Sequence, residues 1–166
     1  MKNLIITSIL ALSVTIVAAQ PSLKTGMRHL ENENYTAALE QFKAIAKLEP
    51  KNGTIYYYIG EVSYRQELND DAEKAYKKGL EINPQCAECK VGLGKLLLDK
   101  NKQEEALVHF ESAARLDKKN PEIFAKIGVA YLYGKNANVD KAIHYLEIAK
   151  GMDASKARYW AHLGDA

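Results

Sequence analysis

The 166-residue sequence contains few of the residues that interrupt or cross-link a chain: 4 prolines, 10 glycines and 2 cysteines. Because the glycines and prolines fall at regular places, the composition argues against a long linker or a low-complexity segment. Two cysteines supply only half of a four-ligand zinc site. A basic stretch is also missing, since the 23 Lys and Arg residues are mixed with 21 Asp and Glu residues. We therefore expect no nucleic-acid partner, and a folded, soluble helical chain.

The N-terminal segment 1–19 differs from the rest of the chain. A short positive start (1–3) precedes an almost wholly apolar run (4–17) and two small residues before Gln20. This order is typical of a cleavable export signal. The alternative is a retained membrane anchor, but the apolar run is shorter than the length of about 20 residues that spans a bilayer. We expect 1–19 to be a signal peptide and the protein to be periplasmic or secreted, without stable membrane insertion after cleavage.

A repeat organises the remaining sequence. Gly26, Gly60, Gly94 and Gly128 are equally spaced, and Gly164 follows after a slightly longer interval. Self-similarity at such a period, about 34 residues, indicates stacked helix–turn–helix units. Downstream of each of the first four glycines comes a small residue, a large apolar residue four places later and, three after that, usually another small one. Spacings of three and four put each set on one helical stripe. The sets are Ala38, Phe42, Ile45; Ala72, Tyr76, Gly79; Ala106, Phe110, Ala113; and Ala142, Leu146, Ala149.

These motifs resemble the tetratricopeptide repeat (TPR) family pattern W-x2-L-G-x2-Y, A-x3-F, P. Trp160-x2-Leu163-Gly164 is similar to its first part, Ala106-x3-Phe110 to its second, and Pro50 and Pro84 close two units. The resemblance covers residues 22–166 and implies an all-α fold, a right-handed α-solenoid of antiparallel helix pairs. The TPR domain would span 20–166, with units at about 20–52, 53–86, 87–120 and 121–156 and a partial fifth at 157–166. The fourth unit, with its longer loop 134–138, is also similar to Sel1-like repeats.

The repeat register predicts the helices. We expect asparagine in each inner turn to cap the following helix or to adopt a left-handed conformation, namely Asn34, Asn69, Asn101 and Asn138. The final segment carries the signature of a first helix, which favours a chain that continues beyond Ala166; the alternative is a capping helix. The expected pairs are 22–32 with 35–48, 54–66 with 70–82, 87–99 with 103–117, and 122–133 with 139–151, followed by a lone helix from about 156.

Cys86-Ala87-Glu88-Cys89 is the one motif that could indicate redox or metal chemistry. A redox pair would need a strand before it and a sheet around it, and a c-type haem site would need histidine where Lys90 stands. In the repeat register both cysteines fall at the junction between two units. The interpretations kept are structural thiols, a local disulfide Cys86–Cys89 formed after export, and thiol–disulfide exchange.

Other catalytic chemistry has no visible basis. The four histidines (His29, His109, His144 and His162) fall in different expected helices, and none has a carboxylate or cysteine at ligand spacing. A nucleophile motif, a phosphate-binding loop and an acid pair are all missing. We expect a protein that is not an enzyme and has no cofactor and no bound metal.

The resemblance places the working surface on the first helix of each pair, which lines the concave side of such a stack. Tyrosine and arginine often anchor protein interfaces, and an extended peptide or a helix could lie there. Alternatively, the tyrosines pack between neighbouring first helices. The groove residues implied are Tyr57, Glu61, Tyr64 and Arg65 in the second unit, Val91, Lys95 and Leu98 in the third, and Val129, Leu132 and Tyr133 in the fourth.

One family use can be tested on the residues. The family's chaperone-binding members grip a C-terminal carboxylate with lysine, arginine and asparagine. The matching positions here hold Leu23, Met27, Tyr57, Glu61, Val91 and Lys95, so that clamp is missing. The sequence favours a non-enzymatic protein–protein interaction scaffold of the bacterial cell envelope with a protein or peptide partner. The alternative is an N-terminal docking or sensory segment of a longer signalling or enzymatic protein.

Overall fold

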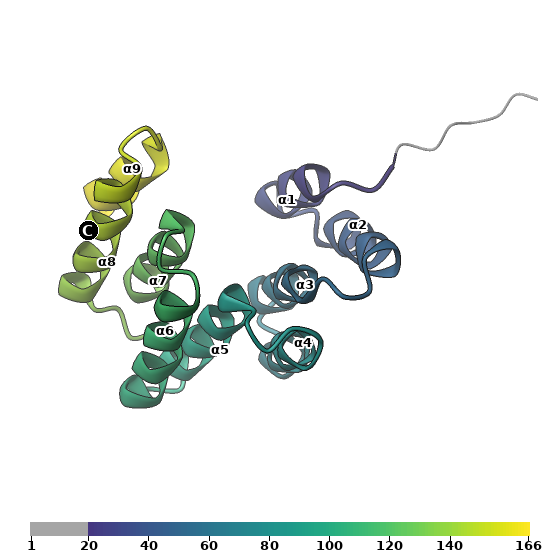
Figure 1. The fold of residues 1–166 in the computed structure, drawn as a ribbon, viewed down its shortest axis with the longest axis horizontal. Coiled ribbons are helices and arrows are strands. Elements are labelled where there is room, and N and C mark those ends of the chain that lie inside the picture. The colour runs from purple at the N-terminus through teal and green to yellow at the C-terminus, as the bar shows by residue number, and fades with distance from the viewer. Residues whose placement is uncertain (1–19) are drawn as a thin grey trace, which may run out of the picture.

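The computed structural model describes residues 20–166, so the predicted export signal at 1–19 lies outside the described residues. The described part contains nine helices and no strand (Figure 1). Their bounds agree with the predicted ones to within one or two residues. The helices are α1 (Leu23–Glu31), α2 (Tyr35–Leu48), α3 (Gly53–Arg65), α4 (Asn69–Ile82), α5 (Ala87–Asp99), α6 (Gln103–Leu116), α7 (Pro121–Tyr133), α8 (Val139–Met152) and α9 (Ala157–Asp165).

The helices form pairs that stack along a curved row. Each of α1, α3, α5 and α7 packs on the helix that follows it, and α3, α5 and α7 also contact one another in succession. In Figure 1 the odd-numbered helices lie on the inner side of the curve and the even-numbered ones on the outer side. The predicted all-α solenoid of helix pairs is confirmed.

The periodic glycines allow the two helices of a pair to approach closely. A Cβ atom added to Gly94 would lie 2.5 Å from Cε1 of Phe110, whose ring is fully buried. Gly26 meets Phe42, Gly60 meets Tyr76 and Gly128 meets Leu146 in the same way. The equal spacing of these glycines therefore repeats one steric contact, in which a bare backbone receives a large side chain from the partner helix.

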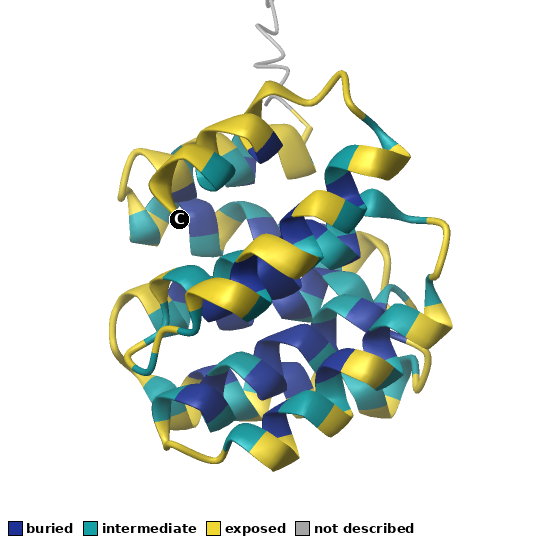
Figure 2. Ribbon diagram, turned by 90° about the vertical axis from the view of Figure 1, so that its left-hand side faces the viewer, coloured by how far each residue is buried: buried dark blue, intermediate teal, exposed yellow. Residues whose placement is uncertain are grey.

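Burial is spread along the stack (Figure 2). The buried apolar residues divide into four clusters, each built from neighbouring helices. One contains Phe42 of α2 with Ile55 and Val62 of α3, and another joins Phe110 of α6 to Ile127 of α7. Each helix pair thus completes its core on the next pair, as expected of a solenoid.

The inner turns differ from one another in their caps. Asn34 and Asn138 accept hydrogen bonds from the amides of the third residue of their helices, and Asn101 adopts a left-handed conformation with φ 59°. The prediction for Asn69 was wrong. It is the first residue of α4, one place after the cap, which is Leu68 and has no side-chain oxygen to accept a bond. In this turn Glu67 takes the left-handed conformation, with φ 61°.

The last helix buries a different aromatic residue from the one that the family motif indicates. Tyr159 is fully buried against Ala125 and Ala149, whereas Trp160 is 53% exposed. The hydroxyl of Tyr159 donates to Glu122 Oε1 at 2.7 Å, which ties α9 to α7. A Cβ atom on Gly164 would meet nothing within 4 Å, unlike those on the four preceding periodic glycines.

Candidate functional site: the concave groove

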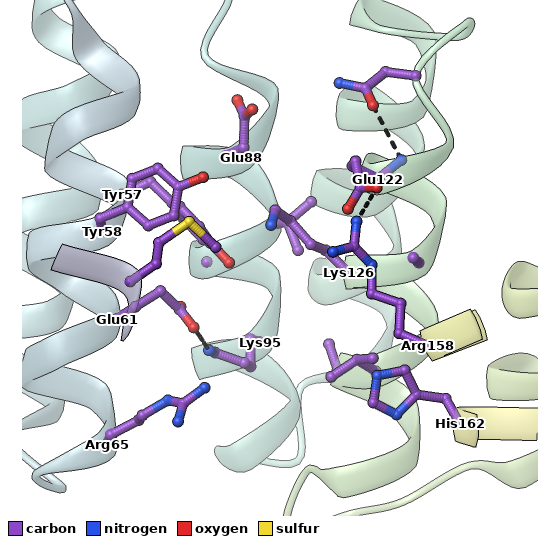
Figure 3. Close-up of a pocket in the computed structure, with 17 residues that line it drawn as sticks. Tyr57, Tyr58, Glu61, Arg65, Glu88, Lys95, Glu122, Lys126, Arg158 and His162 are labelled. Atoms are coloured by element: carbon purple, nitrogen blue, oxygen red, sulfur yellow. Dashed lines mark hydrogen bonds and ion pairs between the residues drawn. The ribbon is translucent and has the colours of Figure 1, made fainter. Parts of the chain in front are cut away.

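A cavity of about 370 Å³ opens on the inner side of the curve (Figure 3). Every residue that lines it belongs to α1, α3, α5, α7 or α9, apart from Asn120, which caps α7. The first helices therefore build this surface, and the second helices contribute nothing to its lining. We call it the groove; it is lined by Met27, Tyr57, Tyr58, Glu61, Arg65, Glu88, Val91, Gly92, Lys95, Asn120, Glu122, Ala125, Lys126, Val129, Ala130, Arg158 and His162.

Six of the ten expected groove residues line it: Tyr57, Glu61, Arg65, Val91, Lys95 and Val129. Tyr64 lies beside Lys95 without lining the groove. The three expected positions near helix ends do not line it either. Leu98 is fully buried in the core cluster shared with α6 and α7, and Leu132 packs half-buried on the same cluster. Tyr133 is exposed and contacts His162 and Asp165.

The sequence interpretation missed several groove residues, and the repeat register could have found them. Tyr58, Gly92 and Lys126 occupy one register position in three successive units, and all of them line the groove. Glu88 and Glu122 share another. The sequence interpretation chose other register positions, such as those of Tyr57 and Glu61, so these two positions were passed over.

One side of the groove carries an ion pair with an aromatic support. Lys95 Nζ donates to both oxygens of Glu61, at 2.6 and 2.8 Å, and the hydroxyl of Tyr76 donates to Glu61 at 2.5 Å. The ammonium of Lys95 also lies 3.8 Å from the ring centroid of Tyr64, whose hydroxyl donates to Asp99 at 2.7 Å. Burial acts to raise the pKa of Glu61, but Lys95 and Tyr76 together bring that pKa below its ordinary value. Glu61 is thus an ionised carboxylate, held in place and balanced in charge by Lys95.

Next to this ion pair, α3 contributes a group of stacked aromatic rings. Tyr57 stacks on Tyr76 with ring centroids 5.9 Å apart and meets the edge of Tyr58 at 5.2 Å. Tyr58 in turn stacks on Phe42 at 5.4 Å. Tyr57 is only 6% exposed, and most of its ring packs on Tyr76 of the second helix α4 and on Tyr58, although it also lines the groove. Tyr56 precedes Gly60 by four residues, as Trp160 precedes Gly164, and the family motif therefore indicates it as the core aromatic. It is nevertheless less buried than Tyr57, and Tyr58 is the half-buried tyrosine that lines the groove.

Lys126 of α7 carries a charge that its surroundings compensate incompletely. Its Nζ lies 5.3 Å from the ring centroid of Tyr57, and it has no ion pair or hydrogen bond within residues 20–166. Burial lowers the pKa of Lys126, and the more distant carboxylates of Glu61, Glu122 and Glu88 offset this only in part. Glu122 is itself paired with Arg158 and accepts a bond from Tyr159.

The two cysteines lie outside the groove and form a disulfide, Cys86–Cys89. Cys86 is the N-cap of α5, and its sulfur accepts a bond from the amide of Cys89 at 3.2 Å. Both residues are buried, at 1% and 0% exposure, against the backbone of Gly53 and Gly79. The disulfide therefore fills the junction of α3, α4 and α5, where an exchange partner has no access to sulfur.

Residues 20–166 contain no group of three or more His, Cys, Asp or Glu side chains placed to hold a metal ion. None of their helices is long and apolar enough to cross a membrane.

An all-helical solenoid whose first helices line a groove defines a class of repeat proteins that generally serve as non-catalytic scaffolds for protein or peptide partners. Comparison with family models gives the particular family. A model described as "Tetratricopeptide repeat" matches residues 23–85, and one described as "TPR repeat" matches 94–132. The chain belongs to the tetratricopeptide repeat family.

Two proteins of similar sequence are also named for this repeat. Tetratricopeptide repeat protein 37 of Xenopus laevis is 34% identical over 82 residues, which are 49% of this chain and 5% of that protein. A TPR repeat-containing protein of Methanocaldococcus jannaschii is 23% identical over 167 residues, covering 92% of this chain and 28% of that protein. The chain thus spans a small part of the length of these relatives.

Solved structures show the same fold. A thermophilic TPR protein of Thermus thermophilus has a TM-score of 0.61 at 21% identity, covering 83% of this chain and 77% of that one. YrrB, described as a TPR protein with an unusual peptide-binding site, has a TM-score of 0.50 at 24% identity, covering 82% and 69%.

Proposed function

We propose that this protein is a non-enzymatic interaction module that binds an extended segment of a partner protein in the groove. The observation that carries the proposal is the lining itself, which comes from the first helices of five successive units and from the cap residue Asn120. A segment lying there would contact several repeats at once, so affinity would accumulate along the stack.

The chemistry of the lining supports a peptide ligand. Val91, Ala125 and Val129 offer small apolar surfaces, and Tyr58 offers an aromatic one. Tyrosine supplies large contact area at a low entropy cost. The Glu61–Lys95 pair is fixed before any ligand arrives, so binding does not have to order it. The description of YrrB as a peptide-binding TPR protein is consistent with this use of the fold.

A matched pair of valine variants tests the proposal. Val129→Glu places a carboxylate on the apolar wall of the groove, whereas Val108→Glu places the same charge on α6, at a side chain that is 64% exposed. Partners would be captured from cell-envelope extract and their affinities measured after purification. We expect Val129→Glu to abolish capture and Val108→Glu to leave it intact. Equal capture by both variants would refute a role for the groove.

We propose further that the protein acts in the cell envelope after removal of residues 1–19. The charged start, apolar run and small residues before Gln20 support this. N-terminal sequencing of protein recovered from the native cell tests it directly. Gln20 should be the first residue, and recovery of an intact N-terminus from the cytoplasm would contradict export.

A second candidate is a docking segment of a longer signalling or enzymatic protein. Gly164 favours it, because the other four periodic glycines each receive a large side chain from a second helix and Gly164 receives none. The coding sequence downstream of Ala166 decides the matter: a further helix with an A-x3-F motif would support this candidate, and an immediate stop codon would remove it.

A further inference from the structure

We propose that Lys126 forms a carboxylate subsite at the centre of the groove, which selects extended peptides carrying an internal acidic residue between apolar ones. This inference rests on the proposed function and names the ligand chemistry of the same site. It differs from recognition of a free C-terminus, because the residues at the positions of that clamp are apolar, aromatic or already paired.

The position of Lys126 is the first argument. Its side chain reaches from α7 across α5 towards the tyrosines of α3 (Figure 3). The residue at the equivalent position of α5 is Gly92, which also lines the groove, and a Cβ atom added there would meet the ring of Tyr76 at 2.5 Å. The ammonium is therefore presented at the middle of the groove, where a ligand passing over α5 would meet it.

The pairing of the other charges is the second argument. Four basic and three acidic residues line the groove. Lys95 is bound to Glu61 and Arg158 to Glu122, so neither cation is free to bind a ligand without losing a partner. Arg65 is exposed at the end of α3. Within the described residues, Lys126 is the half-buried groove cation that has no counter-ion in contact.

The energetic consequence follows from burial. A half-buried ammonium has lost part of its hydration. This loss lowers the pKa of Lys126, and the carboxylates of Glu61, Glu122 and Glu88 offset it only in part. A ligand carboxylate in contact with Nζ would replace the missing interaction with a charge-assisted hydrogen bond. An amide or an apolar group would leave the ammonium uncompensated.

The surroundings indicate an internal acidic residue flanked by apolar ones. The lining continues on both sides of Lys126, from Met27 on α1 to His162 on α9, so a peptide terminus at Lys126 would leave half of the groove empty. Val91 and Val129 lie on neighbouring helices close to the same point. Apolar side chains before and after the acidic residue would bury against them.

A peptide selection with the 166-residue protein tests the proposal. A displayed library of random nonapeptides is selected on the immobilised protein, and the best binder is synthesised with its acidic residue either intact or changed to the matching amide. Affinities of both peptides are measured by calorimetry. The variants are Lys126→Gln, which removes the charge, and Lys126→Arg, which keeps it. Glu88→Gln removes a carboxylate that lines the groove and has no ion pair within residues 20–166.

We expect selected peptides to share one acidic position. Lys126→Gln should weaken the acidic peptide about tenfold and leave the amide peptide unchanged, as for the loss of one charge-assisted hydrogen bond. Lys126→Arg should retain most of the affinity. Glu88→Gln should strengthen the acidic peptide, because it removes a like charge. Thermal unfolding of each variant checks that Lys126→Gln leaves the fold intact.

The possible outcomes distinguish the carboxylate subsite at Lys126 from peptide binding in the groove as a whole. Peptides that bind in the groove, as judged by loss with Val129→Glu, but have no acidic preference or no dependence on Lys126, overturn the subsite and leave the proposed function standing. Failure to select any peptide, or selection of peptides indifferent to Val129→Glu, overturns both.

Discussion

At the scale of single residues, Glu61 shows how local donors outweigh burial. Its pKa is lowered even though burial acts to raise it, because Lys95 and Tyr76 both donate to the carboxylate. A carboxyl group whose pKa is lower in the folded than in the unfolded state stabilises the fold above its unfolded pKa of about 4.3. That contribution is lost as the pH falls through the folded-state pKa.

Removing the ammonium of Lys95 should raise the pKa of Glu61 above its ordinary value. In Lys95→Met the carboxylate of Glu61 stays buried without its ammonium, so we expect the free energy of unfolding at pH 7 to fall by about 3 kcal/mol. The pKa of Glu61 should then rise, and the deficit relative to the natural protein should shrink near pH 4, where Glu61 takes up a proton. Urea unfolding at both pH values measures this. The double variant Glu61→Gln/Lys95→Met should recover most of the loss; a deficit that is independent of pH would contradict the argument.

The periodic glycines yield a second prediction at this scale. In Gly94→Ala the new Cβ would lie 2.5 Å from the buried ring of Phe110, so the helices must separate. We expect a net loss of about 1–2 kcal/mol in unfolding free energy, after the gain in helix propensity is included. Gly151→Ala is the matched control, because nothing lies within 4 Å of its Cβ. It should raise stability by up to about 1 kcal/mol. A stabilising Gly94→Ala would show that the close approach is dispensable.

At the scale of the element, the junction of α4 and α5 is cross-linked by Cys86–Cys89. The bridge joins residues only three apart in sequence, so its effect on the unfolded chain is small, about 2 kcal/mol. Thermal unfolding measured with and without a reductant should show that the reductant lowers the free energy of unfolding by about 2 kcal/mol. The double variant Cys86→Ala/Cys89→Ala should not respond to reductant, and unfolding of the natural protein that is equally indifferent would mean that the disulfide contributes nothing.

Most elements could be predicted from the sequence because one steric contact recurs in every unit. Gly60 with Tyr76 and Gly94 with Phe110 fix the phase of each pair, and the helix bounds follow. The sequence could not predict which of Tyr159 and Trp160 is buried. Both are aromatic residues on a terminal helix, and burial depends on which of them faces an apolar surface of the neighbouring helices. That surface is made by Ala125 and Ala149, from two other helices.

The groove was predictable in its position and only partly in its residues. Val91, Lys95 and Val129 follow from the register, whereas Leu98 and Leu132 have the same apolar character and are enclosed by the next pair. Lys126 was missed because its register position, which it shares with Tyr58 and Gly92, was not among those chosen for the groove. Its ammonium lies 5.3 Å from the ring centroid of Tyr57, two units away, which no property of the lysine itself indicates.

At the scale of the whole molecule, the stack formed by residues 20–166 is held together mainly by contacts between neighbouring pairs, and its ends are the weakest parts. α5 buries eight residues, whereas α1 buries only Gly26 and Leu30 and α9 only Tyr159. In such an array the terminal units open with a smaller free energy than the central ones. Amide hydrogen exchange followed by mass spectrometry should therefore be slowest in α5 and fastest in α1 and α9.

A pair of adjacent aromatic substitutions tests whether opening stays local. Tyr159→Ala removes a fully buried ring and its bond to Glu122, so exchange in α9 should accelerate about tenfold or more. Trp160→Ala, at a side chain that is 53% exposed, should change it little. Because α1 to α4 do not pack on α9, their exchange should be unaffected by either variant. Acceleration of the first two pairs by Tyr159→Ala would mean that the chain opens as one cooperative unit, so that a ligand bound at one end of the groove would order the other end as well.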